Sequence, residues 1–456
     1  MSENPVADEG MAALVERLAA GIRLPKVGLV AQRSTTPALE DVAGRARAEV
    51  RRVLAADPAP DGDPDSRAKG PIAVGVGSRG IAHLALIVGA VVDELRAAGF
   101  EPFVVPAMGS HGGGTPEGQL EALAGYGISE ATLGVPVRAT METRVIGNVD
   151  GVPVHLDRFV AEAGRAFLVA RVKPHTDFRG PIESGPTKMA AIGLGKQAGA
   201  ATLHGLGLAG LRDVMPEAGR FTARRFLLGA IAIVENDADE TASITGLLGA
   251  EVGGQKEMDL LDRARSCLPR IPFANLDVLL VEQIGKDVSG SGMDPNVAGR
   301  WLINGLAEPD PLPVHSIVAL DLTDASHGNA LGMGLADFTT ERLAGKLDPL
   351  SMVMNAVTSG WAAMPRSRTP IVMPDDRSAL IASLASCGTK AATEPRLVWI
   401  RDTLHTTSMA VSEVLWGELA DHPGLEPLVE PFELPFGPDG SLRPIGSLGI
   451  GVPTAR

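Results

Sequence analysis

Short apolar segments alternate with longer amphipathic segments along most of this chain. Apolar segments of strand length fall at residues 72–77, 103–109, 166–172, 276–285, 316–323 and 370–374, and helix-like patterns cover 81–99, 118–127 and 336–347. Strands that alternate with helices are typical of α/β folds whose sheets are largely parallel. The pattern therefore predicts two α/β domains with largely parallel sheets and an active site in the cleft between them.

Stretches that contain several prolines mark the expected domain boundaries. Prolines interrupt the pattern at 266–277, just before a new strand-like segment, so we expect an N-terminal domain over 1–270 and a C-terminal domain over 271–435. A Pro- and Asp-rich stretch at 55–67 is expected to be a linker. The Gly- and Pro-rich segment 436–456 is expected to pack back on the N-terminal domain as a tail.

Charge and composition narrow the classes of partner. The 456 residues include 55 acidic and 41 basic side chains, which gives a net charge of −14. Such a surface repels nucleic acid and anionic membranes, but a local basic pocket can still bind a small anion. There are two cysteines, and the sequence has neither a signal-peptide pattern nor an apolar run of membrane-spanning length. We expect a cytoplasmic protein without nucleic-acid or membrane partners. The sequence does not predict the oligomeric state, and a homo-oligomer is one of the open alternatives.

Polar side chains that could bind a ligand or take part in catalysis follow several of the predicted strands. Arg79, His111 and His175 come shortly after the segments at 72–77, 103–109 and 166–172, and Gln283 and Lys286 flank the end of the segment at 276–285. Ligands of α/β proteins bind at the carboxyl ends of the strands. The strand ends are therefore the expected site.

The segment from 173 to 204 adds further candidates among small residues. His175 follows a proline, Lys188 lies in a Gly- and Pro-rich stretch, and His204 ends an Ala-rich stretch. His111 belongs to a glycine-rich turn, which permits close approach of the backbone to an anion. Each residue alone also has an ordinary interpretation, as a solvated loop histidine, a capping or packed histidine or a surface lysine.

The ordered set of these residues resembles the nickel-dependent lactate racemase family over about residues 70 to 330. The resemblance implies a nickel-pincer nucleotide (pyridinium-3-thioamide-5-thiocarboxylic acid mononucleotide with nickel) bound covalently to Lys188, with the nickel bound by His204 sixteen residues later. It implies that His111 and His175 are an acid/base pair and that Arg79, Gln283 and Lys286 belong to the active site. Cofactor-assembly enzymes are then implied as partners.

The sequence departs from the family pattern in three places. Val76 stands where the family has an Asp, the stretch from His175 to Lys188 is longer, and Trp301 and Trp361 both qualify as the active-site tryptophan. Lys196 is a rival attachment site, ranked after Lys188. These departures bear on the identity of the substrate more than on the chemistry.

The function implied is a racemase or epimerase of a small anionic 2-hydroxy acid, by hydride abstraction and return. Imidazoles suit the proton transfers because their pKa lies near neutral pH. Three other interpretations stay open at this point: a zinc hydrolase with His111, His175 and His204 as ligands, a Schiff-base enzyme using Lys188, and a non-catalytic small-molecule binding protein of the same fold.

Overall fold

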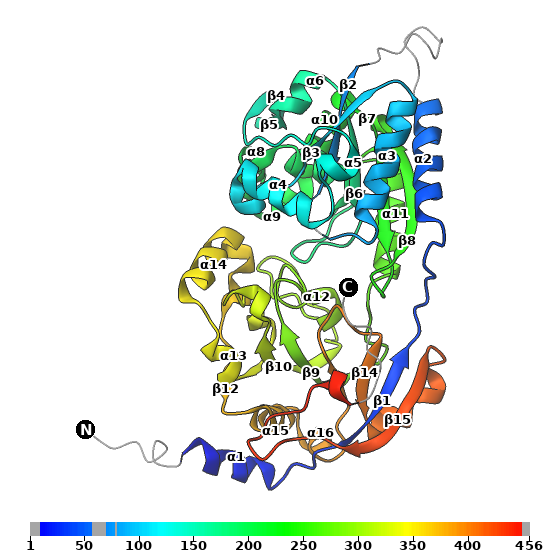
Figure 1. Ribbon diagram of the computed structural model, residues 1–456. Coiled ribbons are helices and arrows are strands. Elements are labelled where there is room, and N and C mark those ends of the chain that lie inside the picture. Colours follow the sequence, from blue (N-terminus) through cyan, green and yellow to red (C-terminus); the bar gives the residue numbers. More distant parts are fainter. Residues whose placement is uncertain (1–9, 57–69, 78–79, 449–456) are drawn as a thin grey trace, which may run out of the picture. The chain divides into compact units, whose positions relative to one another are not determined.

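A computed structural model describes residues 10–56, 70–77 and 80–448 and divides the chain into two compact units (Figure 1). Thr36–Cys267 form the unit that we call the five-stranded unit, after its main sheet. Met1–Thr35 and Leu268–Arg456 form the other, the eight-stranded unit.

The main sheet of the five-stranded unit is parallel apart from its last strand. Its order is β3-β2-β6-β7-β8, in which β2, β3, β6 and β7 run parallel and β8 is antiparallel to β7. The bounds are β2 Pro71–Val76, β3 Glu101–Pro106, β6 Ala166–Arg171, β7 Leu227–Glu235 and β8 Thr241–Leu248. The loops after β3, β2 and β6 therefore leave the same edge of the sheet from neighbouring strands.

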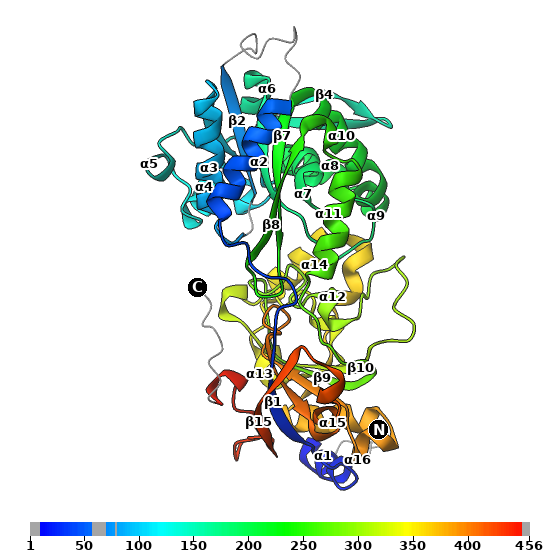
Figure 2. The ribbon, with the colours of Figure 1, turned by 90° about the vertical axis from the view of Figure 1, so that its right-hand side faces the viewer.

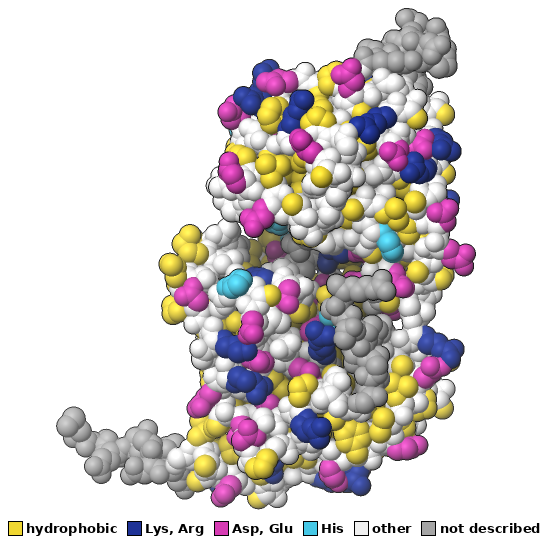
Figure 3. Space-filling model, in the orientation of Figure 1, with side chains coloured by type: hydrophobic (Ala, Val, Ile, Leu, Met, Phe, Trp, Pro, Cys, Tyr) yellow, Lys and Arg dark blue, Asp and Glu magenta, His cyan; other side chains and the backbone are white. Residues whose placement is uncertain are grey.

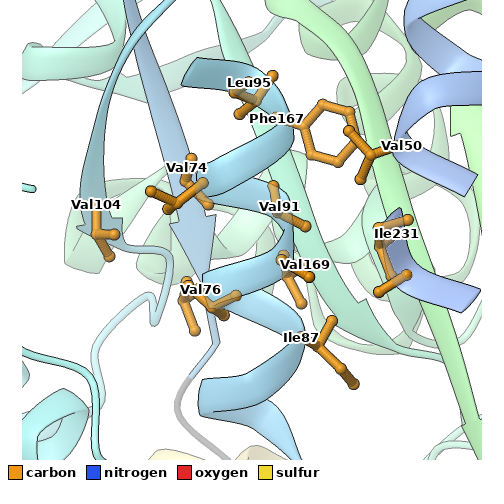
Figure 4. Packing of buried hydrophobic residues seen from close by; sticks show 14 of the residues in the cluster. Val50, Val74, Val76, Ile87, Val91, Leu95, Val104, Phe167, Val169 and Ile231 are labelled. Atoms are coloured by element: carbon orange, nitrogen blue, oxygen red, sulfur yellow. The ribbon is translucent and has the colours of Figure 1, made fainter. Parts of the chain in front are cut away.

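Helices cover both faces of this sheet, as the near-continuous apolar strands require. On one face α2 (Val42–Ala56) and α3 (Leu84–Ala97) pack on side chains such as Val74, Phe167 and Ile231 (Figure 4). On the other face α6 (Arg158–Ala163), α10 (Met215–Phe226) and α11 (Gln255–Ser266) cover the alternate positions, and Figure 2 shows α10 and α11 opposite α2 and α3.

Shorter elements connect these layers. A separate hairpin pairs β4 with β5, and a series of short helices follows β3 and β6. Their bounds are α4 Pro116–Gly125, α5 Glu130–Leu133, β4 Thr143–Val149, β5 Val152–Asp157, α7 Gly185–Lys188, α8 Lys196–His204 and α9 Gly207–Ala209.

The eight-stranded unit contains a mixed sheet in the order β12-β11-β10-β9-β13-β14-β1-β15. The first five strands are parallel and the last three join antiparallel. The bounds are β1 Lys26–Gln32, β9 Leu276–Ile284, β10 Val314–Leu322, β11 Phe338–Thr340, β12 Ile371–Met373, β13 Leu397–Ile400, β14 Ser408–Ser412 and β15 Leu425–Glu433.

Two apolar clusters cover the faces of this second sheet. One joins Val281 and Ile400 to Leu415 of α17, and the other joins Leu280 and Trp399 to side chains of α1 and α15. The helices are α1 Met11–Ala19, α12 Pro295–Ala298, α13 Glu341–Gly345, α14 Pro349–Ala363, α15 Asp376–Ser386, α16 Thr389–Thr393 and α17 Glu413–Trp416. Among the helices that the structure describes, none has the length and apolar character needed to cross a bilayer.

The α/β class with largely parallel sheets is confirmed, and each of the six predicted strands is present within a few residues. The helix predicted over 336–347 is wrong in its first half, where Phe338–Thr340 form β11. Thr340 then caps α13 by accepting the Leu343 N–H, so the β-branched residues end a strand and only the next five residues are helical.

The chain divides differently from the expected domains in two places. The segment before residue 36 groups with the eight-stranded unit, because β1 pairs with β14 and β15 there. The described part of the tail, 436–448, packs within the eight-stranded unit, since Leu442 and Ile445 join the cluster around Trp399, which also includes Val15 and Leu29. The expected boundary at 266–277 includes the division after Cys267, whereas most of the expected linker at 55–67 lies outside the described residues.

Candidate functional site

His111 lies in the loop after β3, at the carboxyl edge of the five-stranded sheet. Its side chain is exposed, and Gly112–Gly114 follow it with φ values of 67°, 66° and 64°, a conformation that favours glycine. The fully buried Gln119 donates through Nε2 to the carbonyls of Gly109 (3.0 Å) and His111 (3.2 Å). The buried amide of Gln119 therefore fixes the backbone of the loop that carries His111.

Lys196, the rival attachment site, is fully buried and serves the same loop. Its ammonium donates to the Pro106 carbonyl at the end of β3 and to Gln119 Oε1 at 3.2 Å, and it lies 3.0 Å from Asp157 Oδ2. Burial lowers the pKa of Lys196, and the Asp157 carboxylate opposes that change. These contacts give Lys196 a structural task, and its burial leaves no room for a bulky adduct.

His175 lies in the loop after β6, and its ring is oriented by its neighbours. Nδ1 accepts the main-chain N–H of Asp177 at 3.0 Å, and the ring packs on Phe178 with centroids 4.5 Å apart. The Asp177 carboxylate oxygen Oδ2 lies 4.0 Å from the same nitrogen. Because a backbone N–H can only donate, the neutral ring carries its proton on Nε2 in this arrangement.

A buried carboxylate, Glu183, fixes the loop that holds His175. Glu183 accepts the main-chain N–H groups of His175 (2.8 Å) and Gly180 (3.0 Å) and pairs with Arg265 Nη2 at 2.7 Å. Arg179 Nη1 adds a bond to the His175 carbonyl at 2.6 Å. The stretch between His175 and Lys188, which looks long in the sequence, is thus an ordered loop closed on one carboxylate.

Lys188 is half-buried at the end of α7, and its neighbour Thr187 is anchored in the interior. The Thr187 N–H and hydroxyl donate to the two oxygens of Glu257 at 3.0 and 2.6 Å, and Gly253 N–H donates at 2.8 Å. Burial raises the pKa of Glu257, and these hydrogen bonds oppose the rise. Lys188 therefore extends from a turn whose backbone is fixed.

The turn after Lys188, a π-helical stretch at Met189–Gly193, lies against the ends of β2 and β3. Gly109 N–H donates to the Gly193 carbonyl at 3.1 Å, and a Cβ placed on Gly193 would lie 2.7 Å from the Ala107 carbonyl oxygen. A Cβ on Gly77 would lie 3.4 Å from the sulfur of Met189. The loops after β2 and β3 are thereby brought beside the segment that carries Lys188.

His204 ends α8, where its side chain is exposed but still electrostatically linked to other candidates. Desolvation of the ring by nearby protein atoms lowers the pKa of His204, the charge of Lys188 lowers it further, and Asp177 opposes both. The charges of Lys188 and Asp177 therefore both act on the His204 ring. The imidazole of His204 is accordingly neutral near pH 7.

Gln283 and Lys286 lie in the eight-stranded unit, at the carboxyl end of β9. Gln283 N–H donates to the Arg401 carbonyl at 2.9 Å, which places the end of β9 beside the loop after β13. Lys286 donates its N–H to Ser326 Oγ (2.8 Å) and its ammonium to the Gly290 carbonyl (2.7 Å). Arg79, the remaining predicted residue, falls outside the described residues.

The two candidate tryptophans have very different surroundings. Trp301 is half-buried; its main-chain N–H donates to Glu308 Oε2 at 2.7 Å, and its carbonyl accepts from Arg366 Nε at 2.7 Å. Trp361 is 73% exposed on α14, where hydrophobic side chains gather at the surface (Figure 3). Their assignment stays a prediction.

The arrangement bears on the choice of metal chemistry. Within the described ranges, three or more His, Cys, Asp or Glu side chains nowhere gather in a geometry suited to a metal ion. His111, His175 and His204 are thus not grouped as a three-histidine zinc site. A cofactor that supplies most donor atoms of its own metal and needs one protein imidazole fits these residues better than a zinc ion does. His204 is exposed and neutral, and the nearby Lys188 lies on an anchored turn.

Sequence reasoning missed the residues that hold the candidates in place. Glu183, Glu257, Gln119 and Asp157 are buried polar side chains that no local pattern distinguishes from surface residues. It also missed His405, which follows the apolar run of β13 and satisfies the same strand-end criterion as His111 and His175.

The comparisons with known proteins give a weak similarity of fold. No protein-family model matches this sequence, and no curated protein matches it. A crystal structure of a protein from Thermotoga maritima has 13% identity and a TM-score of 0.42, covering 61% of this chain and 70% of that one. The lactate racemase apoprotein from Thermoanaerobacterium thermosaccharolyticum has 12% identity and a TM-score of 0.43, covering 78% and 81%. Neither similarity carries information on the roles of side chains.

Proposed function

We propose that this chain is a racemase or epimerase of a 2-hydroxy acid, with a nickel-pincer nucleotide attached to Lys188. The observation that carries the proposal is the electrostatic grouping of Lys188, His204 and Asp177, the last of which also bonds to the ring of His175. These interactions support a site in the five-stranded unit that would combine attachment, metal binding and proton transfer.

The residues present suit that cofactor. Lys188 would hold it through a thioamide bond, and His204 would bind its nickel, for which neutral imidazole is a good ligand. The lowered pKa of His204 keeps the ring in the neutral form. When bound, the group would supply the hydride acceptor, and the protein would supply positioning and proton transfer.

Two histidines would handle the proton of the substrate hydroxyl. Loss of hydride from C2 and of the proton from the hydroxyl leaves a planar keto acid, and their return to the other face inverts the centre. His111 and His175 would accept and return that proton, since imidazole titrates near neutral pH.

Asp177 can support His175 in both protonation states. The neutral ring accepts the Asp177 N–H at Nδ1, as the structure has it. The charged ring would carry a proton on Nδ1, and the Asp177 carboxylate, now 4.0 Å away, could accept that proton in a hydrogen bond. A small rotation of either side chain would exchange one partner for the other.

The substrate carboxylate needs cationic partners. We propose Arg79 and Lys286 for this task and Gln283 as a hydrogen-bonding group. The planar guanidinium of Arg79 and the compact ammonium of Lys286 would together hold the carboxylate and polarise the oxygen at C2.

A screen of 2-hydroxy acids by chiral chromatography tests the activity, using protein made together with the cofactor-assembly enzymes. His111→Ala and His175→Ala should each abolish interconversion while nickel stays bound. Loss of nickel in both variants would make these histidines ligands and overturn their assignment as the acid/base pair.

A further inference from the structure

An apolar patch lies on and directly after α14, at the surface of the eight-stranded unit (Figure 3), and we call it the α14 patch. Its members and their exposed fractions are Leu350 71%, Val353 60%, Met354 58%, Val357 69%, Trp361 73% and Met364 40%. The first four follow the i, i+3, i+4, i+7 spacing that places side chains on one face of a helix. The last two come after Gly360, whose φ of 73° breaks the helix. One face of α14 is therefore apolar along its straight part.

This helix is fixed at both ends but poorly covered by its own unit. The Asp348 side chain caps the first turn by accepting the Ser351 N–H at 2.8 Å, and Asn304 Nδ2 donates to the Trp361 carbonyl at 2.8 Å. Ala363 is nevertheless the one residue of α14 that is buried in the described structure. A short helix is only marginally stable in water unless it buries an apolar face. The α14 patch therefore lacks a partner surface within its unit.

The absence of charge narrows what can cover the α14 patch. No Asp, Glu, Lys or Arg lies between Asp348 and Arg366, although 21% of the chain is charged. A membrane-surface helix would carry Lys or Arg beside its apolar face, and a basic partner would be attracted to the acidic surface elsewhere. Two copies of this chain, each with a net charge of −14, repel one another, so they associate most readily through an uncharged surface.

The size of the α14 patch also suits a dimer. Six large side chains that are 40 to 73% exposed present several hundred Å² of apolar surface, which is more than a monomer usually leaves uncovered. One partner's share of a standard interface is about 800 Å². Around a two-fold axis the same patch serves both copies, because such an interface is self-complementary.

We propose that two copies of this chain pair through the α14 patch around a two-fold axis, with their α14 helices antiparallel and crossing between Val353 and Met354. Leu350 of each copy then lies opposite Val357 of the other copy, because these two positions are equally spaced on either side of the crossing. The second copy supplies the cover that the unit itself lacks. The pairing needs neither cofactor nor substrate, so it is independent of the proposed function.

The first test is sedimentation of the full chain, without cofactor, over a wide range of concentrations. The chain should reach twice its own mass, and Val357→Asp should weaken self-association by at least about 100-fold, since each dimer would bury two unpaired carboxylates. Val145→Asp is the matched control, because Val145 on β4 is 58% exposed and lies outside the patch. Circular dichroism should show that both variants are folded. A chain that stays monomeric at every concentration, or equal weakening by the two variants, would overturn the interface.

The second test uses charge pairing to check the antiparallel arrangement. Leu350→Lys alone should also give monomers. The two substituted positions face each other across the proposed axis, so mixing L350K chains with V357D chains should restore dimers that contain one chain of each kind. Native mass spectrometry resolves these mixed dimers from dimers of a single variant. A mixture that stays monomeric would overturn the proposed pairing, since docking of the patch on any other surface gives the two substitutions no reason to compensate.

Discussion

Lys196 Nζ lies 3.0 Å from Asp157 Oδ2 in a fully buried ion pair, and the same ammonium binds the carbonyl at the end of β3. The pair therefore joins the hairpin strand β5 to the strand that precedes His111. Removing one partner of a buried pair leaves an uncompensated charge. This relationship makes Lys196 a structural residue of the candidate site.

Lys196→Met should lower the free energy of unfolding by about 3–5 kcal/mol, measured by denaturation followed by far-UV circular dichroism. Hydrogen exchange should accelerate at residues 107–119, because Gln119 and Pro106 lose their shared partner. Adding Asp157→Asn should restore part of the loss. A stable single variant with unchanged exchange would contradict this role.

The partnership of Asp177 with His175 predicts a change in the pH dependence of activity. Asp177→Asn keeps the main-chain N–H that supports the neutral ring but removes the carboxylate that would support the charged ring. The acidic limb of the kcat/KM profile should therefore move to lower pH. Asp213→Asn is a matched control, since Asp213 pairs with Arg212 on an exposed stretch of the same unit. Equal profiles for the two variants would refute the role of Asp177.

His204 should report the charges of its neighbours even in the unmodified chain. Lys188→Met removes a positive charge and should raise the pKa of His204, whereas Asp177→Asn removes a negative charge and should lower it. Ring ¹⁵N titration measures both changes. Shifts in the other direction, or none, would separate Lys188 from His204 and remove the main support for the proposed function.

The ionisation of Glu282 should make the stability of the eight-stranded unit depend on pH. Burial raises the pKa of Glu282 from 4.5 to about 7, although hydrogen bonds from Ile445 N–H and Trp399 Nε1 oppose the rise. The folded state then binds more protons than the unfolded state between these values. Stability should fall as pH rises from about 4.5 to about 7 and level off above that.

Glu282→Gln keeps an acceptor oxygen for both donors and removes the ionisation. The variant should be more stable than the unsubstituted chain at pH 8 by roughly 2–3 kcal/mol and equal to it near pH 4.5. All four tryptophans lie in this unit, so their fluorescence during denaturation reports on it alone. Glu418→Gln is the control of opposite sign, because Arg396 lowers the pKa of Glu418. A variant less stable than the unsubstituted chain at pH 8 would disprove the account of Glu282.

The strand-end positions of His111 and His175 could be predicted because parallel strands expose their carboxyl ends at one edge and hydrophobic runs mark the strands. Local patterns also predicted β2, β3, β6, β9 and β10, with bounds that differ from the observed ones by only a few residues. Long-range pairing could not be predicted in this way. β1 pairs with β14 and β15, whose paired residues lie 377 to 407 positions later in the sequence, and that contact depends on the sheet as a whole.

The task of Lys196 was also beyond the sequence. Whether a lysine is exposed or paired inside depends on partners such as Asp157, Gln119 and Pro106, which lie 39 to 90 positions away. The same holds for Glu183 and Glu257, whose burial gives the loops of His175 and Lys188 their order. Such residues are recognised by where their hydrogen bonds go, and the sequence alone does not contain that information.

The attachment of a cofactor at Lys188 is the central claim, and intact mass with nickel analysis tests it most directly. Protein made with the cofactor-assembly enzymes should carry one adduct, which peptide mapping should place on Lys188 and not on the buried Lys196. Lys188→Ala should lose both adduct and nickel, and His204→Ala should keep the adduct and lose the nickel. An unmodified, nickel-free chain under these conditions would contradict the claim.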